Sequence, residues 1–232
     1  MQVMLLAAGK GTRLGELGRQ TPKVLVEIGG RPLLARQLDY LAREGAEHVV
    51  INAHWLADQI VDFVDKRELP CKVEVVVEPE LLGTAGGLRN ALPHFECHEP
   101  IVVLNGDTLI DAPLERIVGE HIESAAEATI CASWLDDCTG KGVITVDPEG
   151  CVTAFEEKPA LPRPGLASAG LYVIERELAA LIPHGVFADL AMDLFPLALD
   201  LDLHLRVEPL EGSFADIGTP EALDEARSEI AP

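Results

Sequence analysis

A glycine-rich stretch close to the N-terminus carries residues that could bind phosphate. Residues 7–14 (AAGKGTRL) follow a short apolar run, and two cations, Arg13 and Lys23, lie within and just after them. Glycines let main-chain N–H groups approach a phosphate closely, and a guanidinium can donate two hydrogen bonds to one phosphate. The stretch lacks the third glycine of a dinucleotide-binding motif and the Gly-Lys-Ser/Thr ending of a P-loop. It therefore predicts a phosphate site of another kind, with a plain tight turn as the alternative.

Two aspartates could hold a metal ion. Asp107 ends residues 105–107 (NGD) after an apolar run, and Asp216 lies in residues 214–220 (FADIGTP) before the last helical segment. Mg²⁺ prefers a few carboxylates together with phosphate oxygens and water. An aspartate that starts a turn is the alternative for Asp107. Helix capping explains Thr219 but leaves Asp216 unexplained, so a second magnesium carboxylate is the functional interpretation.

Two further strings could contact a substrate. The small residues of 82–87 (LGTAGG) would let a flat group lie against the main chain, although a loop entering a helix has the same composition. In residues 155–159 (FEEKP) a carboxylate stands beside a cation, and such a pair can hold sugar hydroxyls and a phosphate together. A solvated run of charges is the alternative there.

The elements that must position these groups alternate between strands and helices in the first half. Hydrophobic periodicity predicts strands at residues 2–7, 48–52, 72–77 and 101–104, and helices at residues 32–43, 56–64 and 86–92. Such alternation is typical of a parallel sheet with helices on both faces. Because parallel strands end at one edge of a sheet, we expect the loops after the first and fourth strands to face a common crevice.

The second half predicts an antiparallel or mixed section. The expected strands are residues 127–135, 142–146, 151–155 and 171–174, and the expected helices are residues 188–199 and 220–230. The turn-forming residues 147–150 (DPEG) predict a hairpin between the second and third of these strands. The fold class is therefore α/β, with a Rossmann-like, mostly parallel but mixed sheet sandwiched by helices. No repeat, linker or boundary is visible, so we expect a single domain over residues 1–232.

Composition narrows the classes of function. The chain is 48% hydrophobic and has a formal net charge of −21, which favours a sizeable core and argues against nucleic acid or anionic membranes as partners. No apolar run approaches the roughly 18 residues of a membrane helix, and residues 3–8 are too short for a signal peptide, so we expect a cytoplasmic protein. The five cysteines are scattered without a CxxC pair, which favours reduced thiols over a zinc site.

Together and in this order, the five strings resemble those of the sugar-1-phosphate nucleotidyltransferase family. The likeness runs from the first strand to residues 216–220 (DIGTP), almost the whole chain. Residues 82–86 (LGTAG) and 217–220 (IGTP) look most like mannose-1-phosphate and D-glycero-D-manno-heptose-1-phosphate guanylyltransferases. Residues 52–60 are similar to the N-acetylmuramate-1-phosphate uridylyltransferases.

The resemblance implies a role for each residue that matches a family motif. Arg13 would bind the triphosphate and the departing pyrophosphate, and Lys23 would contact the phosphates at the reacting centre, which makes these two the catalytic residues. Magnesium would be held by Asp107 and Asp216. The nucleotide-binding residues would be Ala8, Gly9, Gly11, Thr12, Gly83 and Thr84. The residues that bind the sugar phosphate would be Gly142, Glu157, Lys158 and Gly170.

The resemblance also implies a fold of the nucleotide-diphospho-sugar transferase type, with a nucleotide-binding half at about 1–110 and a sugar-binding half at about 111–232. Two strings depart from the family pattern. Residues 15–18 (GELG) stand where the family often has RPLT, and residues 168–170 (SAG) stand where it usually has NAG. A shorter hydroxyl replaces an amide in the second case, which leaves the identity of the sugar open.

The implied activity joins a nucleoside triphosphate to a sugar 1-phosphate and releases pyrophosphate, with GTP and mannose- or heptose-1-phosphate as substrates and Mg²⁺ as cofactor. The sugar phosphate is already ionised, so no protein base or covalent intermediate is needed. The alternatives are a UTP-dependent N-acetylmuramate-1-phosphate uridylyltransferase, a cytidylyltransferase acting on phosphocholine, and a non-catalytic regulatory relative. A glycosyltransferase would require an Asp-x-Asp motif, and residues 105–107 contain one acid. The chain is expected to be a monomer or a homodimer.

Overall fold

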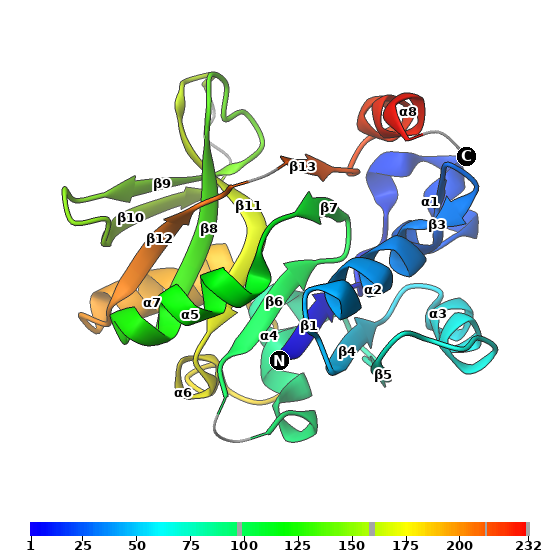
Figure 1. Cartoon of the computed structure of the whole chain (residues 1–232), viewed down its shortest axis with the longest axis horizontal. Coiled ribbons are helices and arrows are strands. Elements are labelled where there is room, and N and C mark those ends of the chain that lie inside the picture. The colour runs from blue at the N-terminus through cyan, green and yellow to red at the C-terminus, as the bar shows by residue number, and fades with distance from the viewer. Residues whose placement is uncertain (97–98, 158–160, 212, 231–232) are drawn as a thin grey trace.

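The protein, seen here in a computed structural model that describes residues 1–96, 99–157, 161–211 and 213–230, is built on a nine-stranded mixed sheet (Figure 1). The strands follow the order β10-β9-β11-β6-β1-β4-β5, and β8 pairs with β11 and β12. These strands are β1 (Gln2–Leu6), β4 (His48–Ala53), β5 (Lys72–Val77), β6 (Ile101–Asn105), β8 (Ala128–Leu135), β9 (Gly142–Val146), β10 (Val152–Glu157), β11 (Gly165–Ile174) and β12 (Leu205–Pro209).

Helices and two small ribbons complete the described part of the chain. The α-helices are α1 (Glu16–Gln20), α2 (Leu33–Arg43), α3 (Ala57–Asp65), α4 (Gly83–Ala91), α5 (Leu114–Ser124), α6 (Arg176–Ala179), α7 (Phe195–Asp200) and α8 (Pro220–Glu229). The short helices are the 3₁₀ turns η1 (Thr12–Leu14), η2 (Lys23–Leu25) and η3 (Leu92–His94) and the π-helix η4 (Leu190–Leu194). The ribbons pair β2 (Glu27–Ile28) with β3 (Arg31–Pro32), and β7 (Thr108–Asp111) with β13 (Ser213–Asp216).

The first half of the sheet is parallel and the second half is mixed, as predicted. Strands β6, β1, β4 and β5 run parallel to one another. Strand β11 runs antiparallel to β6, β8 and β9, and β12 returns parallel to β8. The predicted hairpin of β9 and β10 is confirmed. The carboxyl ends of β1 and β6 lie side by side, with Leu6 opposite Asn105.

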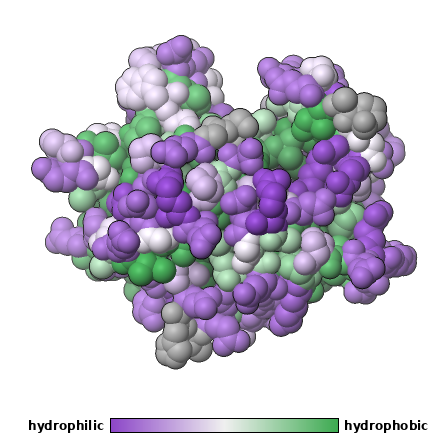
Figure 2. All heavy atoms as spheres, viewed as in Figure 1, coloured by the Kyte–Doolittle hydropathy of each residue, from purple (hydrophilic) through white to green (hydrophobic). Residues whose placement is uncertain are grey.

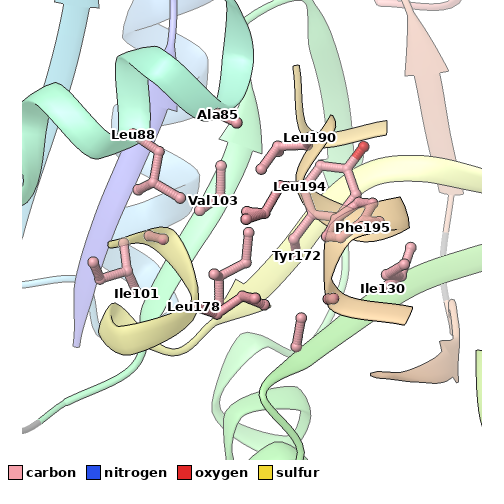
Figure 3. Packing of buried hydrophobic residues seen from close by; sticks show 14 of the residues in the cluster. Ala85, Leu88, Ile101, Val103, Ile130, Tyr172, Leu178, Leu190, Leu194 and Phe195 are labelled. Atoms are coloured by element: carbon pink, nitrogen blue, oxygen red, sulfur yellow. The ribbon is translucent and has the colours of Figure 1, made fainter. Parts of the chain in front are cut away.

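Helices cover both faces of the sheet because successive residues of its central strands are apolar and point to opposite sides. Val3 and Leu5 of β1 pack into a cluster with side chains of α2, α3 and α5. Met4, between them, packs into a second cluster with side chains of α4, α6 and α7. Figure 3 shows this second cluster, where the rings of Phe195 and Tyr172 lie 5.5 Å apart between centroids. The predicted α/β sandwich is confirmed.

One predicted helix differs from the structure. Residues 188–199 were expected to form one continuous helix, but the π-helix η4 precedes α7. Pro196 has no N–H to donate to the carbonyl of Met192, so a regular α-helical ladder cannot run through this point. The carbonyl of Ala188 is also committed elsewhere, because it accepts hydrogen bonds from the first turn of α4.

Several elements were not predicted. Helix α5 and strands β7, β12 and β13 were absent from the expectation, and β11 is longer than the predicted residues 171–174. Among the described residues, no helix is long and apolar enough to cross a membrane. The cysteines of the described part are free thiols, as predicted: Cys71, Cys131, Cys138 and Cys151.

The surface is hollowed above the sheet. Figure 2 shows a notch in the upper outline, between the tips of β8 and β11 on one side and helix α8 on the other. Lys141 lies in the loop between β8 and β9, and Asp216 is the last residue of β13. Both residues line the larger of the two cavities that make up the candidate site.

Candidate active site

Two adjoining cavities lie at the carboxyl ends of the parallel strands. The larger has a volume of about 580 Å³ and the smaller about 280 Å³. The two cavities share four of their lining residues, which mark the junction between them: Thr84, Asn105, Asp107 and Asp189. Residues after β1 and after β6 line the smaller cavity together, so the crevice predicted between these loops exists.

The turn after β6 is held against the end of β1. The N–H of Gly106 donates to the carbonyl of Leu6 at 2.8 Å. A Cβ atom at Gly106 would lie 2.4 Å from that oxygen, so only glycine allows this approach. Asp107 is thereby placed next to the glycine-rich loop that follows β1.

Asp216 reaches Asp107 through the β7–β13 ribbon. In this ribbon Asp216 is paired with Thr108, and the N–H of Ile217 donates to the carbonyl of Asp107 at 2.8 Å. Gly218 follows, and a Cβ atom there would lie 2.7 Å from Asp216 Oδ1 and 2.8 Å from a guanidinium nitrogen of Arg13. The ribbon and this glycine therefore bring the two predicted metal carboxylates and Arg13 together.

Two lysines are paired with these carboxylates. Lys23 Nζ lies 2.5 Å from Asp107 Oδ2 and 3.9 Å from Asp216 Oδ1. Lys141 Nζ, from the opposite wall, donates to Asp216 Oδ2 at 3.0 Å. The side chain of Lys23 is only 11% exposed, so this charge is held in the site rather than in solvent. With Arg13, three cations thus lie around Asp107 and Asp216.

The electrostatics keep Asp216 ionised. Burial by itself would raise the pKa of Asp216, but Lys141, and then Lys23 and Arg13, outweigh it and hold the pKa below its ordinary value. Asp216 Oδ1 is buried and has no hydrogen-bond partner among the residues that the structure describes. A buried, ionised oxygen in this state can accept a cation, so the residues present fit a divalent metal.

The donor set fits a site that the substrate completes. Within the described residues, no group of three or more His, Cys, Asp or Glu side chains could hold a metal ion. A metal between Asp107 and Asp216 would therefore have two protein carboxylates, with its other positions left to water and phosphate oxygens. Mg²⁺ prefers that arrangement.

A buried amide and carboxylate connect the two loops of the smaller cavity. Asn52 Oδ1 accepts the N–H of Ala7 at 2.8 Å, and Asn52 Nδ2 donates to Glu78 Oε1 at 2.7 Å. Glu78 Oε2 accepts the N–H of Leu82 at 3.2 Å. Burial raises the pKa of Glu78, and these hydrogen bonds partly offset the effect. The pair fixes the loop after β1 relative to the loop that enters α4, although Gly87 is needed to make room for it.

The predicted nucleotide residues separate into two groups. Ala8, Gly9 and Gly83 line the smaller cavity, and Thr84 lines both cavities. The hydroxyl of Thr84 donates to Asp189 Oδ1 at 3.1 Å, so it is already engaged by the protein.

Gly11 and Thr12 line neither described cavity. Gly11 has a φ of 60°, the left-handed region, and it packs on Gly18, where a Cβ atom would lie 2.1 Å from the carbonyl oxygen of Gly11. The indole N–H of Trp55 donates to the carbonyl of Gly18 at 2.9 Å. The segment 15–18 thus packs against the glycine-rich loop through Gly18.

The predicted sugar-side residues line the larger cavity. Gly142, Glu157 and Gly170 are all in its wall. Gly170 has a φ of 74°, and a Cβ atom there would lie 2.7 Å from the side chain of Asn105. The hydroxyl of Ser168 donates to Tyr172 Oη at 3.0 Å, so part of its hydrogen-bonding capacity is used inside the protein. Lys158 lies outside the described residues.

Sequence reasoning missed three residues that shape the site. Lys141 binds Asp216, Asn52 holds the main chain of the smaller cavity, and Asp189 lies at the junction of the two cavities. Lys141 and Asp189 stand in loops without a recognisable pattern, and their contacts depend on distant segments. Asn52 could have been found, because a polar residue at the end of an apolar strand faces the same edge as Asp107.

Comparison with known proteins connects the whole chain to one family profile. The nucleotidyl transferase profile matches residues 2–231. The chain is 33% identical to a UTP–glucose-1-phosphate uridylyltransferase of Synechocystis sp. and 31% identical to a mannose-1-phosphate guanylyltransferase of Mycobacterium tuberculosis, over 94% and 95% of its length. It spans only 60% and 62% of the length of these relatives.

A solved structure has the same fold. HddC from Yersinia pseudotuberculosis aligns over 98% of both chains, with 28% identity and a TM-score of 0.86. The structure of HddC complexed with GMP-PN aligns with a TM-score of 0.85.

Proposed function

The chain belongs to the nucleotidyl transferase family, and from this membership we propose that it transfers a nucleotidyl group from a nucleoside triphosphate to a sugar 1-phosphate and releases pyrophosphate. The observation that carries the proposal is the junction of the two cavities. Asp107 and Asp216 meet there with Lys23, Lys141 and Arg13. Such an arrangement suits a reaction in which two anions must be brought together.

The two cavities suit the two substrates. The smaller cavity is lined by main chain at Ala8, Gly9 and Gly83, so it offers close approach and backbone hydrogen bonds to a base. The larger cavity carries Glu157, whose oxygens can accept hydrogen bonds from sugar hydroxyls. In this proposal the triphosphate extends from the smaller cavity to the junction, where the sugar phosphate meets it.

The chemistry requires positioning and charge neutralisation rather than a protein base. An ionised oxygen of the sugar phosphate attacks the α-phosphorus in line, and pyrophosphate leaves on the opposite side. Lys23 and Arg13 would offset the negative charge of the phosphates as it shifts toward the leaving group. Asp107 and Asp216 would hold Mg²⁺, which when bound supplies a Lewis acid for phosphate oxygens.

The proposed substrates are GTP with mannose 1-phosphate or heptose 1-phosphate. The similarity to the Mycobacterium tuberculosis guanylyltransferase and to HddC, solved with GMP-PN, supports guanine. The similarity to a uridylyltransferase keeps UTP as the second base to test.

A grid of substrates tests the proposal directly. Pyrophosphate release would be measured in Mg²⁺ with GTP, UTP, CTP, dTTP and ATP against mannose-, heptose-, glucose- and N-acetylmuramate-1-phosphates and phosphocholine. We expect the strongest rate with GTP and mannose- or heptose-1-phosphate. Activity with phosphocholine alone would show that the second substrate is phosphocholine and not a sugar 1-phosphate. No activity with any pair, from folded protein, would contradict the proposed activity.

A further inference from the structure

Lys141 is fixed at the cavity wall although it lies in a loop. Cys138, in the same loop, is fully buried in a small apolar cluster with Val143 and Ala167. Its N–H donates to the carbonyl of Arg163 at 3.0 Å, and the N–H of Lys141 donates to the carbonyl of Cys138 at 3.0 Å. The main chain at Lys141 is therefore anchored, while its long side chain spans the cavity.

The ammonium of Lys141 is bound to the carboxylate of Asp216, which the proposed metal ion would also need as a ligand. It donates to Asp216 Oδ2 at 3.0 Å, and both side chains are 28% exposed, so the pair is reachable from the cavity. Its neighbours Gly140 and Gly142 line the same cavity and have no side chains that could block its movement. Lys141 is therefore a cation that faces the sugar side of the site and is held there by one carboxylate.

A lysine and a divalent cation compete for the same oxygens. An ammonium is a point charge with three donors on a flexible stem, and it can change its partner within a few ångströms. When a metal binds Asp216, the charge of Lys141 loses its counter-ion and is repelled. The phosphate of the incoming sugar substrate would then bring a new negative charge into the cavity that Lys141 lines.

We propose that Lys141 is an exchangeable counter-charge: it neutralises Asp216 in the substrate-free protein and binds the phosphate of the sugar substrate once a divalent cation takes Asp216. This inference rests on the proposed function. It makes Lys141 a substrate-binding residue that also opposes metal binding before the substrates arrive.

The test measures metal and sugar phosphate separately in Lys141→Gln. Mn²⁺ affinity, measured without substrates from the electron paramagnetic resonance signal of free Mn²⁺, should rise by roughly five-fold because a competing charge is gone. The KM for the sugar 1-phosphate should rise about ten-fold because a charge-assisted hydrogen bond is lost. The KM for the nucleotide should change less than about two-fold, since Lys141 lines only the larger cavity.

The controls separate this role from a structural one. Lys66→Gln removes the same charge from an exposed position directly after α3 and should change neither quantity. Lys141→Arg keeps the charge, so its KM for the sugar phosphate should lie close to that of the wild type. A merely structural lysine would weaken both metal and sugar binding when it is replaced.

Either of two results would overturn the proposal: weaker Mn²⁺ binding in Lys141→Gln, or an unchanged KM for the sugar phosphate. A wild-type protein that binds Mn²⁺ but turns over no substrate pair would contradict the proposed function instead. The Mn²⁺ measurement would then decide by itself whether Lys141 and a cation compete for Asp216.

Discussion

At the scale of single residues, the site is defined by charges that depend on one another. Lys23 is paired with Asp107, which lies at the junction of the cavities, so the charge of Lys23 is held at the site. The neighbouring cations hold the pKa of Asp216 below its ordinary value, and one of its oxygens is buried with no hydrogen-bond partner in the described part of the chain. These features indicate a site prepared for a cation and phosphates rather than a closed network of ion pairs.

Replacing Asp107 tests the metal assignment. We expect Asp107→Asn to lower the rate of pyrophosphate release in Mg²⁺ by roughly 10²-fold or more, because a metal ligand supplies several kcal/mol of charge stabilisation. The melting temperature should stay close to that of the wild type, since a partly exposed carboxylate contributes little packing. Asp111→Asn, an exposed aspartate on β7, is the matched control and should keep full activity. Near-normal rates in Asp107→Asn would show that the metal lies elsewhere.

Replacing Lys23 tests the catalytic charge. Lys23→Ala should lower kcat by roughly 10²-fold, the effect of losing one electrostatic stabiliser at the reacting phosphates. Single-turnover kinetics with saturating nucleotide would separate this effect from weaker binding. A loss of only a few-fold would assign Lys23 to the rim of the site.

At the scale of elements, the strands determine where the loops of the smaller cavity lie. In β4, Asn52 directly follows the apolar residues 49–51, and Glu78 directly follows β5. Their hydrogen bonds reach the loop after β1 and the loop before α4. One buried polar link therefore connects three neighbouring strands and fixes the loops of the smaller cavity relative to one another.

Breaking this link should affect stability and nucleotide binding together. Asn52→Leu keeps the volume but takes away the hydrogen-bond partner of the N–H of Ala7 and that of Glu78 Oε1, which should cost about 1–3 kcal/mol in the free energy of unfolding per group. The KM for the nucleotide should rise more than the KM for the sugar phosphate. Urea unfolding and steady-state kinetics measure both effects. Gln59→Leu removes an exposed amide and serves as control, and equal effects of the two changes would refute the role of Asn52.

The same scale explains what the sequence could and could not predict. Strands β1, β4, β5 and β6 are short and mostly apolar, so their existence and the shared edge with Asp107 follow from local pattern. In the β7–β13 ribbon, residues 108–111 pair with residues 213–216, which lie far apart in the sequence. No local sequence pattern predicts such a pairing. Lys141 was missed for the same reason, because its partner is brought to it by that ribbon.

At the scale of the whole molecule, a buried histidine joins the second half of the sheet to helix α5. His121 is fully buried, with Nδ1 2.8 Å from Thr129 Oγ1 and Nε2 3.2 Å from Glu175 Oε1. Burial lowers the pKa of His121 below its ordinary 6.5, and Glu175 offsets only part of this effect. At mildly acidic pH, the unfolded chain therefore binds a proton at His121 more readily than the folded protein does.

This linkage predicts a loss of stability in acid. As the pH falls below 6.5, the unfolded chain binds a proton at His121 before the folded protein does, so the free energy of unfolding should fall by up to about 1.4 kcal/mol per pH unit. His121→Asn should reduce this slope between neutral pH and about pH 5.5, measured by urea unfolding at each pH. His184→Asn, at an exposed site, should leave the slope unchanged. An unchanged slope in His121→Asn would mean that other groups carry the acid sensitivity.

The β7–β13 ribbon also sets an order in time. A chain that is being synthesised acquires Asp107 and the loops after β1, β5 and β6 well before β13 emerges. Only when β13 pairs with β7 does Asp216 arrive beside Asp107. Until residues 213–216 have been synthesised, the chain therefore carries Asp107 without Asp216, and the pair of carboxylates is completed only near the end of synthesis.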